Sequence, residues 1–353
     1  MTASDRGHVV YVTGGAGFLG SNLCRVLLDR GDRVVSIDNY STGFLANLDG
    51  VAVHPSFTAV NHDITQPFEG CADLAAIMRS EPPDRICNLA SPASPPTYQL
   101  LALETLMVGS VGMRNVLDLA LSSGARVLQA STSEVYGDPD VNPQPESYWG
   151  RVNPIGPRSM YDESKRFAEA LCTTYARVHG VEVRLARIFN TYGPGLSPDD
   201  GRVVTNFVAQ ALRREPLTVY GDGTQTRSFC FVDDEIRGLV ALLDSDVQGP
   251  VNIGNPNDFT MLALASLVLE VTGSDSVIEH RALPGDDPLQ RRPDIRRAQV
   301  QLGWEPTVML REGIGRTVAW FRTLPEFATI PAISTRQPGR TTSGAAEDEC
   351  HGF

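Results

Sequence analysis

Two short segments of the sequence hold side chains whose types and spacing suit acid–base chemistry. The first is Thr132, Ser133 and Glu134, in which two hydroxyls and a carboxylate follow one another. The second is the pair Tyr161 and Lys165, which stand four residues apart and so share one face of a predicted helix. An ammonium beside a phenol stabilises the phenolate and lowers its pKa, which predicts that Tyr161 acts as a base near neutral pH. The chemistry indicated is the removal of a proton from a substrate hydroxyl.

These side chains must be held by strands and helices that alternate along the first half of the chain. Short apolar runs have the pattern of buried strands at 9–13, 33–38, 85–91, 126–132 and 181–190. Helical stretches stand at 21–31, 103–122 and 161–179. This alternation is typical of an α/β fold, here a Rossmann-type doubly wound parallel sheet with a smaller C-terminal substrate-binding portion. Because Thr132 ends a predicted strand, we expect it at the carboxyl edge of the sheet, where ligands of such folds bind.

The segment after the first predicted strand has the glycine spacing of a dinucleotide-binding turn. Gly14, Gly17 and Gly20 lead from the strand into a helix, where glycine permits a tight turn and a close approach to a pyrophosphate. The next strand ends in Asp38, whose carboxylate accepts hydrogen bonds from ribose hydroxyls and repels a 2′-phosphate. We therefore expect NAD rather than NADP, against the plainer alternative of a glycine turn beside a surface aspartate. The other predicted cofactor contacts are Phe18, Leu19, Asn39, Asp63, Ile64, Leu89, Ala90, Tyr161 and Lys165.

The composition of the chain limits its partners and its location. With 353 residues, 42% of them hydrophobic, the chain can form one large or two smaller domains. Its net charge of -12 at pH 7 argues against nucleic acid or an anionic membrane as a partner. No apolar run approaches the roughly 20 residues of a membrane span, and the N-terminal segment lacks the features of a signal peptide. The six cysteines show no metal-binding spacing, so we expect reduced thiols, no metal site and a cytoplasmic location.

Longer motifs make the chain resemble a known family over roughly residues 8 to 322. In chain order they are TGGAGFLG, NLASPASPPTY, ASTSEVYGDP, NPIGPRSMYDESKR, ARIFNTYGP, DGRVVTNF, EPLTVYGDGTQTRSF and DDPLQRRPDI. Through them the chain resembles the extended short-chain dehydrogenase/reductase family of NAD-dependent epimerases and dehydratases. Within that family it is most similar to the UDP-glucuronate decarboxylases, which are also called UDP-xylose synthases.

The resemblance implies how the chain is divided and assembled. We expect a mainly NAD-binding Rossmann domain over 8–190 and a mainly nucleotide-sugar-binding domain over 191–322. The stretch 325–353 is rich in Ser, Thr, Gly and Pro, which predicts a disordered tail. The resemblance also implies a homodimer, formed by packing of the helical stretches 103–122 and 161–179.

The residue at position 133 separates the possible reactions. By resemblance, sugar dehydratases have an acidic residue where Ser133 stands, because they protonate a departing 6-hydroxyl. Epimerases usually lack a carboxylate at the position of Glu134. A substrate that already bears a C6 carboxylate would be repelled by an acid at 133, whereas Ser133 can donate a hydrogen bond to it. The sequence therefore favours decarboxylation of UDP-glucuronate to UDP-xylose.

The implied reaction is a closed redox cycle. Tyr161, supported by Lys165 and oriented through Thr132, takes the proton of the C4 hydroxyl while a hydride passes to NAD. The C4 ketone is β to the C6 carboxylate, so loss of carbon dioxide leaves an enolate that hydrogen bonds from Thr132 and Tyr161 stabilise. C5 is then protonated and the hydride returns to C4, with no net consumption of NAD.

Glu134 and Arg291 are, by resemblance, the pair that distinguishes decarboxylases, and their roles stay open. Arg291 could guide the anionic substrate or help place a proton donor at C5, or it could belong to a solvated basic cluster around 291–297. Glu134 could shape the sugar ring or order a water. Arg227 suits a pyrophosphate and Tyr220 could cover the base or ribose. The residues expected to bind substrate are Tyr98, Asn190, Val204, Tyr220, Gln225, Arg227 and Arg291.

Two positions depart from the family pattern, and three other functions remain as alternatives. Gly109 stands where the family often has Asn, and Glu104 stands where a Lys is expected. Both lie near where cofactor or substrate would be held, so the resemblance does not extend to affinity or to closure of this loop. One alternative is a C4 epimerase or 4,6-dehydratase acting on a UDP- or dTDP-sugar. Another is a decarboxylase that releases the UDP-4-keto-pentose. The third is a redox-sensing binding module without catalysis.

Overall fold

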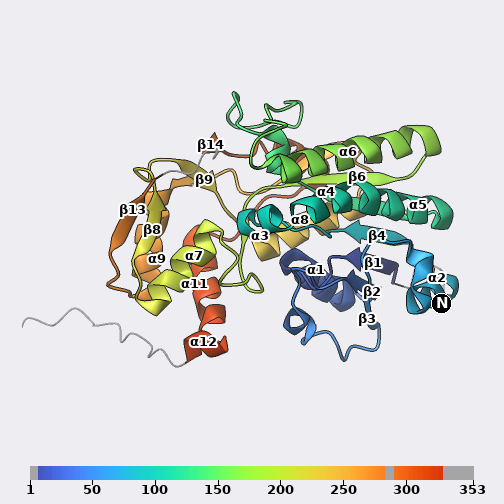
Figure 1. Ribbon diagram of the computed structural model, residues 1–353, viewed down its shortest axis with the longest axis horizontal. Helices are drawn as coiled ribbons and strands as arrows, with labels where there is room; N and C mark the ends of the chain where they lie inside the picture. The colour runs from blue at the N-terminus through green and yellow to red at the C-terminus, as the bar shows by residue number, and fades with distance from the viewer. Residues whose placement is uncertain (1–6, 283–289, 329–353) are drawn as a thin grey trace, which may run out of the picture.

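A seven-stranded parallel sheet forms the centre of the structure, a computed structural model that describes residues 7–282 and 290–328 (Figure 1). Its strand order is β11-β6-β5-β4-β1-β2-β3. The strands are β1 (Val9–Thr13), β2 (Arg33–Asp38), β3 (Phe57–Asn61), β4 (Arg85–Asn88), β5 (Arg126–Thr132), β6 (Val183–Ile188) and β11 (Pro250–Ile253). The order reverses between β1 and β4, and ligands of doubly wound sheets bind at such a reversal. The predicted Rossmann-type α/β fold is confirmed.

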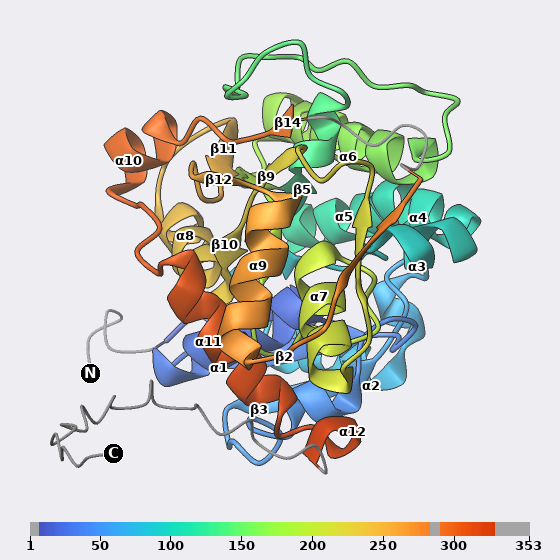
Figure 2. The same cartoon turned by 90° about the vertical axis from the view of Figure 1, so that its left-hand side faces the viewer.

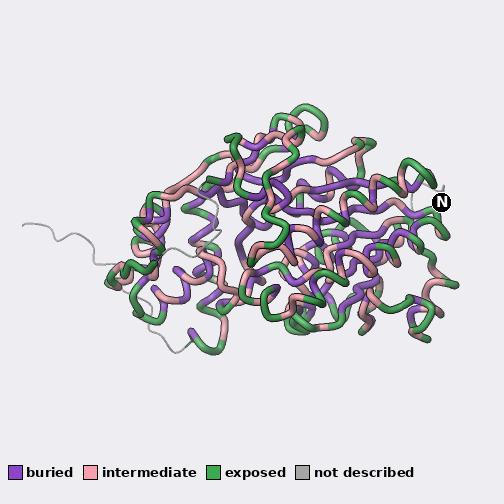
Figure 3. Tube along the Cα trace, turned by 45° about the horizontal axis from the view of Figure 1, so that its top comes forward, coloured by how far each residue is buried: buried purple, intermediate pink, exposed green. Residues whose placement is uncertain are grey.

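Helices cover both faces of this sheet because side chains alternate along each strand. On β1, Val10 and Val12 pack with α1 (Phe18–Asp29) and α8 (Val232–Asp244), while Tyr11 packs on the opposite face. That opposite face is covered by α2 (Ala72–Ser80), α5 (Met113–Ser123) and α6 (Ser159–His179). Burial on both faces explains the continuous apolar runs of the strands, which Figure 3 shows as mostly buried.

The helix expected at 103–122 is interrupted. The chain forms α3 (Pro95–Leu100) and α4 (Ala102–Met107), then the π-helical turn η4 (Val108–Gly112), and only then α5. Gly109 lies in this turn, and a Cβ there would come within 2.7 Å of the Ser164 side chain on α6. The two helices therefore approach closely at a residue without a side chain.

The second half of the chain adds small sheets and helices at one end of the large sheet (Figures 1 and 2). β8 (Leu217–Tyr220) pairs with β13 (Ile278–Arg281), and β7 (Thr191–Tyr192) pairs with β10 (Cys230–Phe231). β9 (Thr226–Ser228) lies between β12 (Asp258–Thr260) and β14 (Gln290–Arg291). The helices of this portion are α7 (Val203–Arg213), α9 (Met261–Thr272), α10 (Arg296–Leu302), α11 (Leu310–Phe321) and α12 (Pro325–Ala328).

The chain crosses between the two portions more than once. β11 and α8 come after residue 190, yet β11 pairs with β6 at the edge of the large sheet and α8 packs against it. The division into 8–190 and 191–322 stays a prediction. Residues 325–328 of the predicted disordered tail form α12, whose Phe327 is buried, and the remainder, 329–353, lies outside the described residues. None of the helices described is both long and apolar enough to span a membrane.

Candidate active site

The segment that leads from β1 into α1 contains two glycines, Gly14 and Gly20, that a residue with a side chain could not replace. Gly14 has a φ of 71°, and a Cβ there would lie 2.7 Å from the backbone nitrogen of Ala90, in the loop after β4. A Cβ on Gly20 would overlap the carbonyl oxygen of Gly14. Gly17 caps the N-terminus of α1, where a Cβ would meet only that same oxygen. The bare backbone and the free N–H groups of the helix start therefore suit a pyrophosphate.

Asp38 joins the end of β2 to the glycine turn. Its Oδ2 accepts a hydrogen bond from the Ala16 N–H at 2.9 Å, and its Oδ1 accepts one from the Tyr40 N–H at 2.8 Å. Burial raises the pKa of Asp38 overall, and the two N–H groups offset only part of this rise. The carboxylate is thus fixed beside the turn, so the residues present fit the adenosine end of NAD.

The other predicted cofactor residues surround the same edge of the sheet. Phe18 and Leu19 open α1, and the Leu89 N–H donates to the Thr13 carbonyl at 3.0 Å. Asp63 accepts hydrogen bonds from Thr65 and from Asn39. Burial raises the pKa of Asp63, but these hydrogen bonds outweigh it and the pKa is lowered overall. The side chain of Ile64 differs in that it belongs to the apolar core.

Tyr161 and Lys165 lie one turn apart on α6, beside the end of β5. The Lys165 ammonium is buried, donates to the Ala130 carbonyl at 2.9 Å and lies 5.7 Å from the centre of the Tyr161 ring. Burial lowers the pKa of Lys165 from 10.5 to about 8. Burial and the charge of Glu134 raise the pKa of Tyr161 to about 12, while its hydrogen bond with Thr132 lowers it. These side chains alone therefore do not produce the lowered phenol pKa expected from the sequence.

Tyr98 lies against Tyr161 in a stacked arrangement. The two ring centres are 4.9 Å apart and the ring planes differ by 10°. The Tyr98 hydroxyl is buried and has no hydrogen-bond partner within the described part of the chain. A buried hydroxyl of this kind is available to a ligand that enters beside Tyr161.

Glu134 forms ion pairs with two arginines that are far apart in the sequence. Its Oε1 accepts a hydrogen bond from Arg291 on β14, and its Oε2 lies 2.8 Å from Nη2 of Arg158, which precedes α6. Burial raises the pKa of Glu134, but the two guanidiniums hold it well below its usual value. Thr132 caps the turn η5 (Ser133–Tyr136) by accepting the Glu134 N–H at 3.2 Å, and Ser133 is buried in that turn.

Arg158 and Asp162 belong to this cluster and were not identified from the sequence. Burial, followed by the charge of Glu134, raises the pKa of Asp162, and its Oδ1 is buried with no hydrogen-bond partner among the residues described. Both residues lie in the segment GPRSMYDE, three positions before and one after Tyr161. Their nearness to Tyr161 on the predicted helix was the available signal.

The residues expected at the nucleotide end are only partly brought together. Arg227 on β9 is the register partner of Arg291 on β14, so the two arginines are neighbours in one small sheet. Gln225 donates to the Tyr220 carbonyl at 2.8 Å. Asn190 is half-buried and its carbonyl accepts the Cys230 N–H at 2.9 Å. Val204 is buried in the apolar core of α7.

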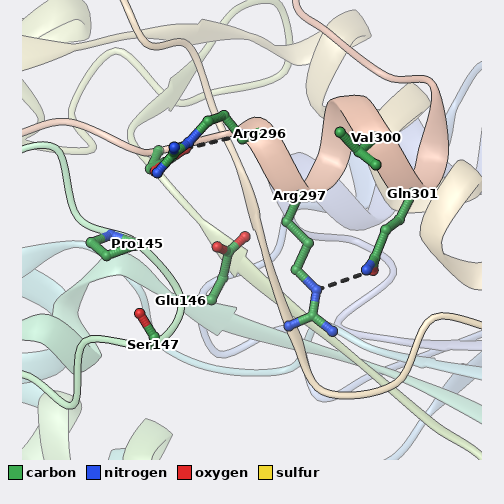
Figure 4. A pocket seen from close by; sticks show the side chains of 8 residues that line it. Pro145, Glu146, Ser147, Arg296, Arg297, Val300 and Gln301 are labelled. Carbon is green, nitrogen blue, oxygen red and sulfur yellow. Dashed lines mark hydrogen bonds and ion pairs between the residues drawn. The ribbon is translucent and has the colours of Figure 1, made fainter.

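A separate pocket of about 440 Å³ lies between residues 145–147 and α10, and none of the predicted site residues lines it (Figure 4). Its charged side chains are already paired, since Arg296 contacts Asp294 and Arg297 donates to Gln301 at 3.1 Å. The pocket is therefore distinct from the candidate active site.

The fold and the glycine turn are those of a Rossmann-fold enzyme that uses a nicotinamide cofactor. Residues 10–254 match the NAD dependent epimerase/dehydratase family. Because this match covers more than half of the chain, the protein belongs to that family.

Similar proteins narrow the comparison further. The chain is 47% identical over 345 residues to UDP-glucuronic acid decarboxylase 1 of Xenopus tropicalis. The matched stretch covers 98% of this chain and 79% of the relative. It is 51% identical over 306 residues to UDP-glucuronic acid decarboxylase 3 of Arabidopsis thaliana, covering 86% of each.

Solved structures of related enzymes have the same fold. UDP-glucose 4-epimerase of Thermotoga maritima superimposes with a TM-score of 0.82 at 28% identity, covering 89% of this chain and 99% of that one. The dTDP-glucose 4,6-dehydratase DesIV of Streptomyces venezuelae, with NAD bound, has a TM-score of 0.80 at 30% identity, covering 89% and 97%.

Proposed function

We propose that this protein converts UDP-glucuronate to UDP-xylose and carbon dioxide. The relatives with about half of their residues identical are named UDP-glucuronic acid decarboxylases. The observation that carries the proposal is the ion-paired group formed by Glu134, buried Arg291 and half-buried Arg158. Its Glu134 carboxylate lies close enough to Tyr161 to raise the pKa of the phenol.

The glycine turn and Asp38 would hold NAD, with Asp63 and Asn39 near its adenosine end. Bound there, NAD would take up a hydride from C4 of the sugar and later return it. Lys165 is buried beside Tyr161 and holds its ammonium against the Ala130 carbonyl. Tyr161 accepts the proton of the C4 hydroxyl as its phenolate, a form that the positive charge of a bound nicotinamide would favour. Thr132 orients the phenol by hydrogen bonding.

The arginines suit a substrate that carries a carboxylate. With Asp162 protonated, the form that its raised pKa favours, two guanidiniums and the Glu134 carboxylate leave this group with one unbalanced positive charge. Nε of Arg291 is buried and, among the residues described, has no hydrogen-bond partner, so it is a donor available to an anion. Ser133 adds no negative charge beside it, unlike the acid that a dehydratase requires. Once C4 is a ketone, the C6 carboxylate leaves as carbon dioxide, and Thr132 and Tyr161 stabilise the enolate oxygen.

Mass spectrometry of the product from UDP-glucuronate, with and without added NAD, tests this function. We expect UDP-pentose and carbon dioxide, with no lasting rise in absorbance at about 340 nm, because the cofactor is regenerated. A UDP-4-keto-pentose with accumulating NADH would identify the enzyme as one that stops before re-reduction. Absence of carbon dioxide release would contradict the proposal and favour an epimerase or dehydratase.

Arg291→Ala and Arg292→Ala form a matched pair for this assay. Arg292 is the next residue, but its guanidinium lies 3.7 Å from Asp258 and not at Glu134. We expect Arg291→Ala to lower kcat/KM by at least about 100-fold, since a buried charge-assisted contact is lost. Arg292→Ala should stay within about threefold of the wild type. Equal losses in both variants would argue for a general basic surface.

We also propose a homodimer and a cytoplasmic location. Exposed apolar side chains gather on α4 and α6, where Leu103 is 74% and Phe167 51% exposed. Cys24, Cys71, Cys87, Cys172 and Cys230 are free thiols, in keeping with a reducing compartment. Light scattering that detected only monomer would contradict the dimer, and cell fractionation tests the location.

A further inference from the structure

Arg291 lies on a strand too short to hold its own position. β14 has two residues, and its ladder with β9 joins Gln290 to Thr226 and Arg291 to Arg227. So short a ladder specifies register weakly, whereas the ion pair with Glu134 requires the Arg291 side chain on one particular face. The segment that follows β14 must therefore be held by other contacts.

The fully buried Gln144 binds this segment and forms an isolated parallel bridge with Pro293. Its Oε1 accepts the Arg292 N–H at 2.8 Å, and its own N–H donates to the Arg292 carbonyl at 2.9 Å. Its carbonyl accepts the Asp294 N–H at 3.0 Å, and its Nε2 donates to the Val141 carbonyl at 2.6 Å. Every polar atom of Gln144 is thus bonded, and three of these four bonds go to residues 292–294.

Asn252 connects the same segment to the turn that carries Glu134. It lies fully buried on β11, and its Nδ2 donates to the carbonyls of Gln144 at 2.9 Å and Asp294 at 3.0 Å. Its Oδ1 accepts the Tyr136 hydroxyl at 2.7 Å. Tyr136 ends η5, the turn that contains Glu134. The contacts form a closed ring, with the Glu134–Arg291 ion pair on one side and the Tyr136–Asn252–Asp294 bonds on the other.

We propose that Asn252 and Gln144 are positioning residues that hold Arg291 against Glu134 for the decarboxylation step. This inference rests on the proposed function. Neither side chain is free to contact a ligand, because all their polar atoms are bonded within the protein. A displacement of about 1 Å at a reacting group can lower a rate by about 100-fold. Tyr161 and Lys165 lie on α6, outside this ring, so C4 oxidation should be largely independent of it.

Asn252→Asp tests the ring with little change of shape. The new carboxylate still accepts the Tyr136 hydroxyl but cannot donate to the Gln144 and Asp294 carbonyls. We expect carbon dioxide release from UDP-glucuronate to fall about 10- to 100-fold, while the initial rise at about 340 nm in a single turnover stays within about threefold. Deuterium uptake by the backbone amides of 290–294 should increase, because the bonds to Asp294 are lost.

Two further variants make the test specific. Asp234→Asn is a matched control: Asp234 is also buried and also joins distant segments, accepting the Thr307 and Val308 N–H groups, but outside the site. It should change neither carbon dioxide release nor uptake at 290–294. In an Arg291→Ala background, Asn252→Asp should lower the rate by less than about threefold more, because residues that act through one another are not additive.

The outcomes separate this inference from the proposed function. Equal losses of the 340 nm signal and of carbon dioxide, or unchanged uptake at 290–294, would overturn the positioning role. If the wild type releases no carbon dioxide, the proposed function fails, and deuterium uptake alone still decides whether Asn252 holds β14. Should Asn252→Asp not fold, Gln144→Met removes only the side-chain bonds to Arg292 and Val141 and should shift both readouts in the same direction by a smaller factor.

Discussion

Lys165 should destabilise the folded protein at neutral pH, and Lys165→Met should therefore be more stable although inactive. Lys165 is only 6% exposed, and burial lowers the pKa of its ammonium from 10.5 to about 8. A shift of this size corresponds to about 3 kcal/mol of unfavourable free energy below pH 8. The cost of removing the ammonium is small, because the Ala130 carbonyl also accepts a hydrogen bond from Gln129 Nε2 at 3.0 Å.

The dependence on pH has a definite sign. Between about pH 8 and pH 10.5 the unfolded chain keeps the Lys165 proton and the folded chain has lost it. Because the unfolded state binds more protons there, the stability contributed by this group rises with pH across that window. From about pH 7 to pH 9.5 the free energy of unfolding of the wild type should rise by about 2 kcal/mol relative to that of Lys165→Met. Other titrating groups are shared by the two proteins, so their effects cancel in this comparison.

Urea unfolding of both proteins, freed of nucleotide, at these two pH values measures this difference. We expect Lys165→Met to be more stable by about 2 to 3 kcal/mol near pH 7 and by less than about 1 kcal/mol near pH 9.5. Turnover of UDP-glucuronate should fall by at least about 100-fold, because the support for Tyr161 is lost. A variant that is less stable than the wild type at pH 7, or a difference that does not change with pH, would refute the reasoning.

Three other substitutions probe the site and its frame. Tyr161→Phe should lower carbon dioxide release and the 340 nm signal together by about 100- to 10,000-fold, since the phenol is the proposed acid–base group. The melting temperature should change by no more than a few degrees. An unchanged rate of carbon dioxide release would exclude Tyr161 from catalysis. Asp38→Ser should raise the KM for NAD by about 10-fold or more and reduce the preference of the enzyme for NAD over NADP, as measured by activity with each cofactor. An unaltered KM for NAD would mean that Asp38 only stabilises the conformation of the glycine turn. Gly109→Asn introduces the residue that the family often has and should destabilise the fold by about 1 to 3 kcal/mol in urea unfolding, because its Cβ would lie 2.7 Å from Ser164. Gly315→Asn on α11, where a Cβ meets nothing within 4 Å, should cost less than about 1 kcal/mol.

Much of the fold was predictable because its signals are local. The strands that form the centre of the sheet are apolar runs. The glycine turn and the Tyr161–Lys165 pair are each recognised from residues that stand only a few positions apart. β3 was missed because only one of its residues, Val60, is buried, so its pattern is not that of a core strand. β11 was not assigned to the large sheet, since nothing in a four-residue run shows which strand it pairs with.

Two members of the proposed catalytic group were named from the sequence, but their contacts were not. The resemblance indicated Glu134 and Arg291 as a pair, yet left open whether Arg291 was part of a solvated basic cluster. The structure buries it against Glu134, across 157 positions of sequence. Arg158 was missed because an arginine before a helix is ordinarily a surface residue.

The sequence by itself determined the central strands of the sheet, the glycine turn and the proposed acid–base pair, because each depends on side chains close together along the chain. Only the tertiary structure decided their energetics. Burial, which depends on the whole fold, lowers the pKa of Lys165 and raises that of Tyr161, reversing the effect expected from the pair alone. The tertiary structure also decided that Arg291 meets Glu134 and that Asn252 meets Tyr136, since hydrogen bonds between distant segments form only when the chain has folded.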